Sequence, residues 1–480
     1  MYKTIFDLIS AQGGLGNVNV NYLPDDPNTS QPQQISRSYY LHELSIKGKL
    51  GVWYSMVEIF QSMEIYEDIF TNSIHGSVMV DDMAGGLSKF MLTGGEQIKI
   101  TASKAIQDTT LIIAREDLIV YQISEVEVKD QKLMRYRLNF TTKAFLNSEK
   151  KRIYRVYKNE RRISELVRKI YATVGSGTTL LTDLDDSISR VNKNYLSPGY
   201  TPFESIDFLC KRAGTNDYCM FFERLNSLAG SNHVLTSMKK LYNRGYGSAT
   251  KVYYNIAPEH YTPASSDIRA YAVNFQDSYN HIQNMRSGFY NSNIKTIDLC
   301  TRRVVNTPVN YMGMEADKTN KFINTSNFFA QYNTAFPEIP GERIITNPYN
   351  DASYNKASWL KYDTYGSTLL SNFRITIDIP GNNNLGVGEY VDLKIPSIEA
   401  YSLNIGSGLV TNDPVFSAKY MITAVKHTFT LSEYSKKVEL SKYNVNINYD
   451  QIINDVGVGY DGPRGNDGGS SGGGESRGNF

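Results

Sequence analysis

Two glutamates are the first candidates for chemistry, because they occupy matching places in two similar stretches of the chain. Glu96 follows Gly95 and opens an alternating apolar segment, and Glu389 follows Gly388 in the same way. A pair of carboxylates is what glycoside hydrolysis requires. Each glutamate, however, comes directly after a turn glycine in its own stretch, so the pattern favours a structural or interface role for both.

The histidines and serines give no sign of a metal site or a nucleophile. The sequence has no His-Glu-x-x-His pair and no two histidines within four residues; the six are His42, His75, His233, His260, His281 and His427. Catalytic zinc needs several such ligands close together, and no Gly-x-Ser-x-Gly elbow surrounds a serine. We therefore expect no catalytic residue, no metal and no cofactor. Specific binding residues cannot be assigned from the sequence.

One histidine stands apart because it continues the alternation of a predicted strand. His427 follows the segment Tyr420–Val425, and the matching place in the first stretch is roughly Val128. A histidine at a strand edge or an interface is the simplest interpretation.

Two further segments resemble nucleic-acid or phosphate motifs. Seven basic residues lie close together but alternate with Ile153, Tyr154, Val156 and Tyr157, which favours a solvated or subunit-facing edge over a DNA contact; they are Lys150, Lys151, Arg152, Arg155, Lys158, Arg161 and Arg162. The run Gly175-Ser-Gly-Thr-Thr179 lacks the Gly-Lys-Ser/Thr ending of a phosphate loop. A helix end followed by a turn is expected there.

Composition narrows the class of protein. The 480 residues include 50 Lys and Arg against 49 Asp and Glu, a net charge of +1, so no overall basic field draws the chain to nucleic acid or anionic lipid. Cys210, Cys219 and Cys300 form no paired motif and indicate a reducing site of synthesis. No stretch reaches the roughly 18 apolar residues of a membrane helix, and the first ten residues do not read as a signal peptide. We expect a protein that is soluble or part of a soluble assembly.

The elements that must position these residues occur twice, about 300 residues apart. In the first copy the strand-like segments are Gly76–Val80, Gly95–Ile100, Tyr121–Val126 and Tyr136–Phe140, and in the second they are Phe373–Ile377, Gly388–Leu393, Tyr420–Val425 and Val438–Leu440. Apolar and polar residues alternate in each, which is typical of strands with one buried face. The pattern aligns Tyr121 with Tyr420. Two antiparallel β modules of one design are predicted.

The segment between the modules has a helical pattern. Apolar residues spaced by three and four predict a helix over 163–174, ended by Gly175. Thr201-Pro-Phe-Glu204 predicts the capped start of a second helix, with Gly214 at its end. A strand is expected over 218–222.

The predicted fold is α+β and mainly β: two tube-like antiparallel β-barrels, an intervening α+β domain and a flexible Gly-rich C-terminal tail. The expected divisions are an arm at 1–38, the first barrel at 39–148, the α+β domain at 149–244, a Tyr/Asn-rich mixed β region at 245–365 that partly completes the second barrel, the second barrel at 366–450 and the tail at 451–480.

Two of these stretches resemble a known family. Tyr420-Met-Ile-Thr-Ala-Val-Lys-His-Thr-Phe429, followed by Lys437-Val-Glu-Leu440, is similar to the C-terminal barrel strands of the central baseplate hub of T4-like contractile-tailed bacteriophages. The order of helix, capped helix and strand from Ile163 to Glu223 also resembles that family, and the likeness runs from about Leu41 to Asn446.

The resemblance implies a structural virion protein rather than an enzyme. Hubs of this family are homotrimers whose two barrels per subunit make a ring of six, which adapts a sixfold tail tube to a threefold central spike and leaves an axial channel for DNA. It also implies contacts with neighbouring baseplate proteins, a place in the tail baseplate and assembly in the host cytoplasm. The alternatives are a tail-associated cell-wall-degrading enzyme and the hub of a bacterial contractile injection system.

Overall fold

The computed structural model describes most of the two modules and the domain between them. The described residues are 3–4, 39–83, 85–104, 111–130, 133–158, 162–175, 177, 179–184, 194–211, 217–228, 231–254, 267–278, 282, 286, 292–298, 302–309, 341–347, 366–368, 370–371, 373–381, 385–396, 412–413 and 416–442. Apart from 3–4, the expected arm at 1–38 lies outside them, as do the expected tail at 451–480, Gly214, His260, His281 and Cys300.

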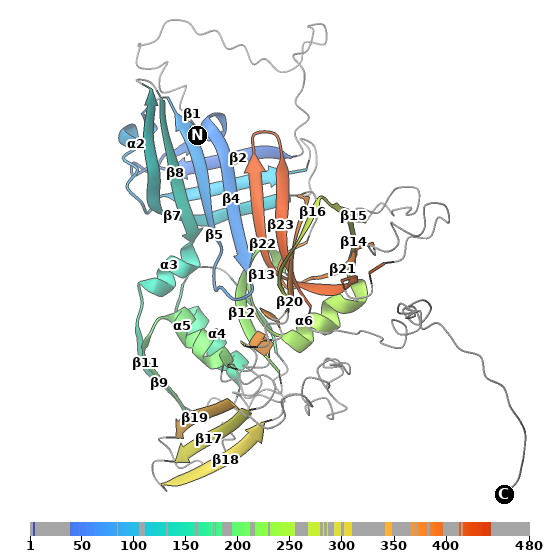
Figure 1. Ribbon diagram of the computed structural model, residues 1–480. Coiled ribbons are helices and arrows are strands. Elements are labelled where there is room, and N and C mark those ends of the chain that lie inside the picture. The colour runs from blue at the N-terminus through green and yellow to red at the C-terminus, as the bar shows by residue number, and fades with distance from the viewer. Residues whose placement is uncertain are drawn as a thin grey trace, which may run out of the picture.

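The described chain is mainly β (Figure 1). Its strands are β1 (Lys3–Thr4), β2 (Tyr40–Lys47), β3 (Trp53–Ser55), β4 (Phe60–Asp68), β5 (His75–Asp82), β6 (Gln97–Ser103), β7 (Leu111–Asp130), β8 (Leu133–Thr142), β9 (Ile153–Lys158), β10 (Leu180–Asp183), β11 (Asn194–Tyr200), β12 (Cys219–Leu228), β13 (Ser231–Ser237), β14 (Thr250–Tyr254), β15 (Ile268–Ala270), β16 (Ala272–Ser278), β17 (Ser292–Asp298), β18 (Arg303–Val309), β19 (Gly341–Asn347), β20 (Phe373–Pro380), β21 (Tyr390–Lys394), β22 (Ala418–Thr430) and β23 (Tyr434–Ser441). Its helices are η1 (Val57–Ile59), α2 (Gly86–Lys89), α3 (Lys143–Glu149), α4 (Ile163–Ala172), α5 (Pro202–Lys211), α6 (Met238–Gly245) and η2 (Tyr246–Ser248).

The first module is a barrel closed by one bent segment. Its strands pair in the order β2, β6, β7, β8, β5 and β4. The chain from β3 through η1 into β4 then joins the two ends, since β3 pairs with β2 and β4 pairs with β5. Alternate side chains of these strands fill the interior, which is why the period-2 pattern is so clear in the sequence.

The second module closes in the same way. Its strands pair in the order β14, β21, β22, β23 and β20, and the nearly continuous segment β15–β16 pairs with β14 through β15 and with β20 through β16. Strand β14 is the exception to the antiparallel pattern, because it runs parallel to both of its neighbours. Part of the Tyr/Asn-rich region therefore completes this barrel.

The two barrels repeat the same turn in atomic detail. The Gly95 N–H donates to the Val120 carbonyl and the Val120 N–H to the Glu96 carbonyl; Gly388, Ile422 and Glu389 make the same pair of bonds. Both glycines have a left-handed φ, of 93° and 80° respectively, which a glycine adopts without strain.

A β-bulge is repeated directly after this turn. In the first barrel Val120 pairs with Phe140 and Gln122 with Asn139, so Tyr121 is the extra residue. In the second, Ile422 pairs with Leu440 and Ala424 with Glu439, so Thr423 is the extra residue. The counterpart of Tyr121 is therefore Thr423, and the alignment of Tyr121 with Tyr420 predicted from the sequence is wrong by three residues.

The segment between the barrels contains both expected helices. Helix α4 begins at Ile163 and buries one apolar face. Helix α5 begins at Pro202 with the predicted capping box: the Thr201 hydroxyl accepts the Glu204 N–H at 3.2 Å, and the Glu204 carboxylate accepts the Thr201 N–H at 2.7 Å. The predicted strand at 218–222 is the start of β12, which forms a small sheet with β13 and β10.

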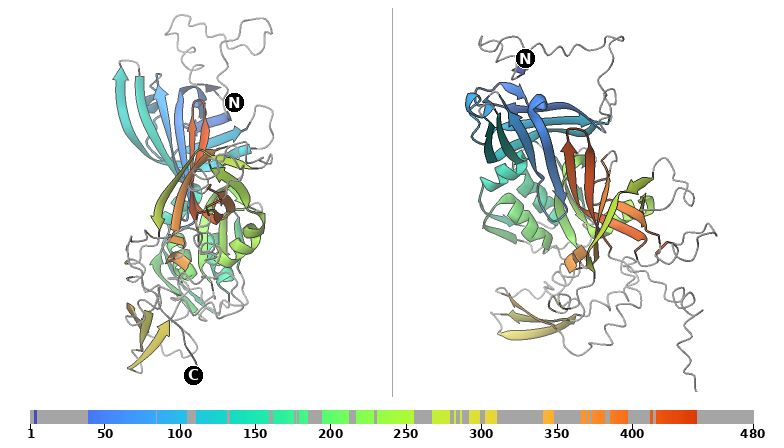
Figure 2. Two further views of the ribbon diagram at one scale, coloured as in Figure 1. Left: turned by 45° about the vertical axis from the view of Figure 1, so that its right-hand side comes forward. Right: turned by 45° about the horizontal axis from the view of Figure 1, so that its top comes forward.

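The small sheet packs against the helices on one face and against the second barrel on the other. Phe221 and Leu235 of the small sheet pack with α4 and α5, while Phe222 and Val234 pack into the core of the second barrel. Strands β17, β18 and β19 form a separate three-stranded sheet at one end of the molecule (Figure 1). The views in Figure 2 show the two barrels lying side by side, with the helices α4 and α5 next to them.

Candidate functional site: the junction between the two modules

The two barrels are joined by a continuous sheet. The outer half of β22, from Ala424 to Thr430, pairs antiparallel with β4 of the first barrel. Its inner half pairs with β21, and β23 pairs along its other edge. A main-chain ladder of this length fixes both the distance and the register between the barrels, because a slip by one residue would turn buried side chains outward. We call this contact the junction.

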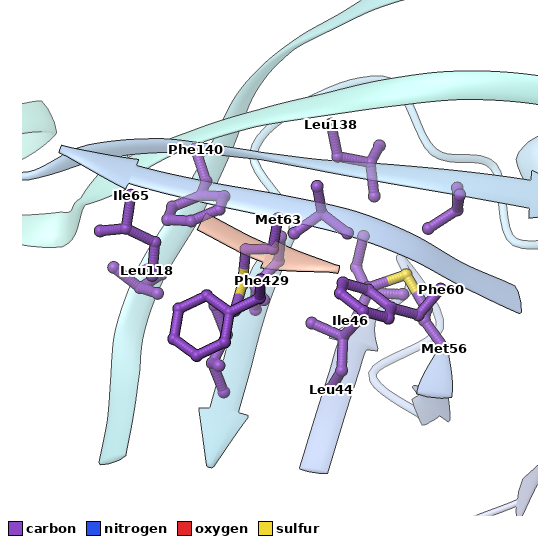
Figure 3. Close-up of a cluster of buried hydrophobic side chains, with 14 of the residues drawn as sticks. Leu44, Ile46, Met56, Phe60, Met63, Ile65, Leu118, Leu138, Phe140 and Phe429 are labelled. Atoms are coloured by element: carbon purple, nitrogen blue, oxygen red, sulfur yellow. The ribbon is translucent and has the colours of Figure 1, made fainter. Parts of the chain in front are cut away.

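The tip of the β22–β23 hairpin enters the core of the first barrel. Phe429 is fully buried there among residues of β2, β4, β7 and β8 (Figure 3). Its ring stacks on Tyr434, with centroids 4.1 Å apart, and meets the edge of Tyr39 at 5.2 Å. The second barrel thus supplies part of the first barrel's core, so neither barrel can tilt without losing buried apolar contact.

A buried polar chain lies in the junction beside these rings. The His427 Nε2 lies 2.8 Å from Oε1 of Glu67 on β4, and its Nδ1 lies 2.9 Å from the Tyr434 hydroxyl. A carboxylate only accepts, so His427 donates from Nε2 and accepts the tyrosine proton at Nδ1. Each ring nitrogen therefore has a partner, as a buried polar group requires.

Burial sets the charges of this chain. It lowers the pKa of His427 below its ordinary value, although the hydrogen bond to Glu67 acts in the opposite sense. Burial alone would raise the pKa of Glu67, but the hydrogen bond from His427 and the charge of Arg224 lower it overall. A neutral imidazole therefore donates to an ionised carboxylate at neutral pH. The pKa of the adjacent Lys436 falls to about 8 because that amine is buried, and its Nζ donates to the Leu385 carbonyl.

A second buried network ties the small sheet to the first barrel. Glu223 on β12 accepts from Arg115 Nη2 at 2.5 Å, from the Thr142 hydroxyl at 2.9 Å and from the Ile74 N–H at 3.2 Å. Arg115 also donates to both oxygens of Asp117, at 2.7 and 2.9 Å. The side chains of Glu223 and Arg115 are 0% and 3% exposed, so this ion pair is removed from solvent screening.

The next residue on β12 ties the same sheet to the second barrel. Arg224 donates from Nη2 to Oε1 of Glu389 at 2.5 Å. A Cβ at position 386 would lie 2.7 Å from that nitrogen, so a side chain there would displace the end of the guanidinium group. Glu223 and Arg224 point to opposite faces of a strand and so reach one barrel each. Strand β12 is therefore a brace between the two modules.

The two glutamates singled out in the sequence lie in separate barrels and hold equivalent turns. Glu96 accepts the N–H groups of Thr93 and Gly94, both at 2.8 Å. Glu389 accepts the Gly386 N–H at 3.3 Å in addition to Arg224. Both carboxylates are engaged by backbone donors of their own turns, which is a structural arrangement.

The structure corrects the expectation for His427. The histidine is not at a strand edge, since β22 is paired on both sides at this position, with Ile65 of β4 and Lys436 of β23. It does lie where the two modules meet. Its counterpart is also not Val128: the register of the hairpins matches Val128 with Phe429. Strand β7 has an extra residue between Ser124 and Glu127, which the alternation of apolar and polar residues does not reveal.

The other candidates are dispersed. His42 contacts Ser103, His75 contacts Ser73, and His233 contacts Tyr171 and lies 3.5 Å from Glu223. Within the described ranges, no three His, Cys, Asp or Glu residues are placed to hold a metal ion. None of the helices described here is long and apolar enough to cross a membrane. Cys210 and Cys219 are buried free thiols.

The basic run lies at the surface of the helical segment. Arg152, Arg155 and Lys158 are exposed, and Arg161 lies outside the described residues. Arg155 and Lys158 line a shallow hollow of about 520 Å³ with Lys169. Gly175 has a left-handed φ of 63° just after α4, and Ser176 and Thr178 lie outside the described residues.

The sequence signal for the junction was weak. Glu67, Glu223 and Arg224 carry no recognisable motif, and their partners are 360, 108 and 165 residues away along the chain. A charged residue at an apolar position of an alternating strand was the available clue, because an acid there must find a partner when it is buried.

No protein family matches the chain, and no curated protein sequence matches it either. Among solved structures, the chain is similar to a tail protein from Neisseria meningitidis MC58, with 10% identity, a TM-score of 0.50, and coverage of 85% of this chain and 98% of that one. It is also similar to the 43 kDa tail protein of prophage MuSo2 from Shewanella oneidensis, with 10% identity, a TM-score of 0.51, and coverage of 84% and 98%.

This chain has the fold of those two tail proteins. The likeness extends over 98% of both neighbours and over 85% and 84% of this chain. At 10% identity it concerns the fold. The mainly β architecture and the resemblance to tail proteins expected from the sequence are thus confirmed at that level.

Proposed function

We propose that this protein is a non-enzymatic structural hub of a phage tail baseplate. Three copies would form a ring of six barrels that joins a sixfold tail tube to a threefold central spike. The observation that carries the proposal is the duplicated barrel with its repeated turn and bulge, held in one fixed arrangement by the junction. The shared fold with tail proteins supports it.

The duplication fits an adaptor between two symmetries. A closed ring presents equivalent surfaces only when the number of its modules matches that of its partner. Three chains with two barrels each would present six similar barrel surfaces toward the tube. The segment between the barrels occurs once per chain, so the trimer would present three copies of it toward the spike. The brace through β12 keeps the angle between barrels constant, which ring closure requires.

The proposed environment follows from this role. The hub would lie in the virion tail after assembly in the host cytoplasm, with the tube protein, the spike protein and neighbouring baseplate proteins as partners. DNA would pass through the axial channel as cargo. A net charge of +1 suits such a passage, because it gives no overall basic field to retain DNA.

Electron microscopy of the purified protein tests the proposal. Class averages should show a ring with six lobes and a central opening. Particles the size of one chain, or a closed ring with another number of lobes, would contradict it. An assay on purified peptidoglycan addresses the enzyme alternative: we expect no lysis, and lysis abolished by Glu96→Gln or Glu389→Gln would refute the non-enzymatic role.

A further inference from the structure

The junction has a counterpart on the other strands of the two barrels, and no strand of the described residues pairs there. In the junction, the outer half of β22 pairs with β4. The repeated bulge and turn make β7 the equivalent of β22, and the closing segments make β16 the equivalent of β4. Among the described residues, β7 beyond Val120 pairs only with β8, and β16 pairs only with β20.

The two registers can be matched residue by residue. Leu440 of β23 and Phe140 of β8 are equivalent, because they pair with the equivalent residues Ile422 and Val120. Phe429 pairs with Tyr434, which lies six residues before Leu440. Val128 pairs with Met134, which lies six residues before Phe140. On the other strands, Met63 pairs with Val78 and Val273 pairs with Ile377. Val78 and Ile377 in turn face equivalent residues, Leu138 and Val438. Val128 thus corresponds to Phe429, and Val273 to Met63.

Burial differs sharply between the equivalent strands. In β22, His427 and Phe429 are at most 2% exposed, because β4 and the first barrel cover them. In β7, Val126 and Val128 are 52% and 67% exposed. A long strand with exposed apolar residues and a free backbone edge is a template for pairing with another chain.

The facing strand has the same character. Phe275, the equivalent of Ile65, is 50% exposed, and the neighbouring Tyr271 is 60% exposed. Isolated apolar residues are common on protein surfaces, but here they follow one strand edge in each barrel.

Polar residues at the two edges are compatible with the same register. In the junction, Lys426 and Glu64 form an ion pair of 2.9 Å across the strands. The equivalent residues are Ser124 and Asn274, by the pairs that each makes within its own barrel. Both are uncharged and can hydrogen-bond, so the pairing brings no like charges together at this position.

The two free edges lie on opposite sides of the barrel pair. Strands β7 and β8 are at one side of the molecule in Figure 1, and β15 and β16 are at the other, with the junction between them. The right-hand view of Figure 2 shows the same order. Surfaces placed in this way make head-to-tail contacts, which close into a ring when the rotation per copy allows it.

We propose that β7 of one copy pairs antiparallel with β16 of a second copy, in the register of the junction, with Val128 opposite Val273 and Val126 opposite Phe275. This inference rests on the proposed trimer and assigns the strands through which its copies touch. The ring then has six equivalent contacts between barrels. Three are the β22–β4 pairings within the chains, and three are the β7–β16 pairings between chains.

Mixed cysteine variants test this register. Directly opposed residues on antiparallel strands have Cβ atoms about 4.5–5.5 Å apart. A chain with Val128→Cys is mixed with a chain with Val273→Cys after dissociation and reassembly, and the mixture is oxidised or treated with a short thiol cross-linker. The matched control replaces Val273→Cys by Leu196→Cys, because Leu196 is an exposed apolar residue on β11, away from both edges. We expect a two-chain product with Val273→Cys and at most a trace with the control.

Native mass of two charge variants completes the test. Val128→Lys should reduce the trimer by tenfold or more at a fixed concentration, and Val156→Lys, an exposed valine on β9, should not. A trimer that gives no Val128–Val273 product, or that Val156→Lys dissociates instead, overturns the strand pairing while the proposed trimer stands. A specific product from a particle with another number of chains supports the pairing and contradicts the trimer. A monomer at every concentration refutes both.

Discussion

Replacing Glu223 by glutamine should loosen the brace between the small sheet and the first barrel. The change keeps the size of the side chain and removes its charge. Glutamine keeps one carbonyl oxygen, so it can accept either from Arg115 or from the Thr142 hydroxyl and the Ile74 N–H, but not from both sides. Arg115 keeps Asp117. Removing one partner of a buried ion pair costs about 3–5 kcal/mol. Because Arg115 keeps Asp117, we expect a loss at the lower end of this range.

Hydrogen exchange measured by mass spectrometry localises this loss. A cost of about 3 kcal/mol corresponds to roughly a hundredfold faster exchange, since each 1.4 kcal/mol is a factor of about ten. We expect this acceleration in peptides covering β12 and the start of β7, with little change in β17 and β18. Local exchange is preferable to one global unfolding curve, because a chain with several cores need not unfold in one step.

The matched control is the same substitution at an exposed ion pair. Glu116 lies 3.2 Å from Lys99 and its side chain is 71% exposed, so Glu116→Gln should change stability by at most about 1 kcal/mol. If Glu223→Gln accelerates exchange no more than Glu116→Gln does, the buried network does not hold the sheet to the barrel and the brace is refuted.

The remaining predictions concern the junction and the repeated turn. The junction should weaken as the pH falls from 7 to 5, because His427 has a lowered pKa and the unfolded state takes up the proton first. The protection factors of β22 amides, which are corrected for the intrinsic exchange rate at each pH, should fall by up to about tenfold per pH unit, and less steeply in His427→Gln. An equal slope in both proteins would exclude His427 as the cause. Gly95→Ala and Gly388→Ala should each lower the urea midpoint by an amount equivalent to about 1–2 kcal/mol, through their left-handed φ. Gly388→Ala should cost more, because its Cβ would also meet Leu241 at 3.2 Å; unchanged midpoints would mean that the turns relax freely.

Local features of this chain were predictable because the residues that form them are neighbours in sequence. The capping box from Thr201 to Glu204 involves four consecutive residues, and the helix after Arg162 shows its buried face as a simple spacing. The duplicated strands were visible for the same reason, since alternation is a local consequence of a sheet with one buried face.

The pairing between distant strands was not predictable. Alternation repeats every two residues and carries no mark for a bulge, so it did not fix the offset between the two copies, and Tyr121 was matched with Tyr420 instead of Thr423. The direction of β14 depends on the chain's path around the barrel, and β14 runs parallel to its neighbours. His427 was expected at a strand edge or an interface, and the two could not be told apart because nothing in its own strand indicates that β4, more than 350 residues earlier, pairs beside it.

Light scattering of the purified protein over a range of concentrations tests the central claim most directly. A trimeric hub has three chains of 54.1 kDa in one particle, so we expect a mass of about 162 kDa, with six barrels in the ring. A mass of 54.1 kDa at every concentration would contradict the proposed hub, because two barrels in a single chain cannot close a sixfold ring.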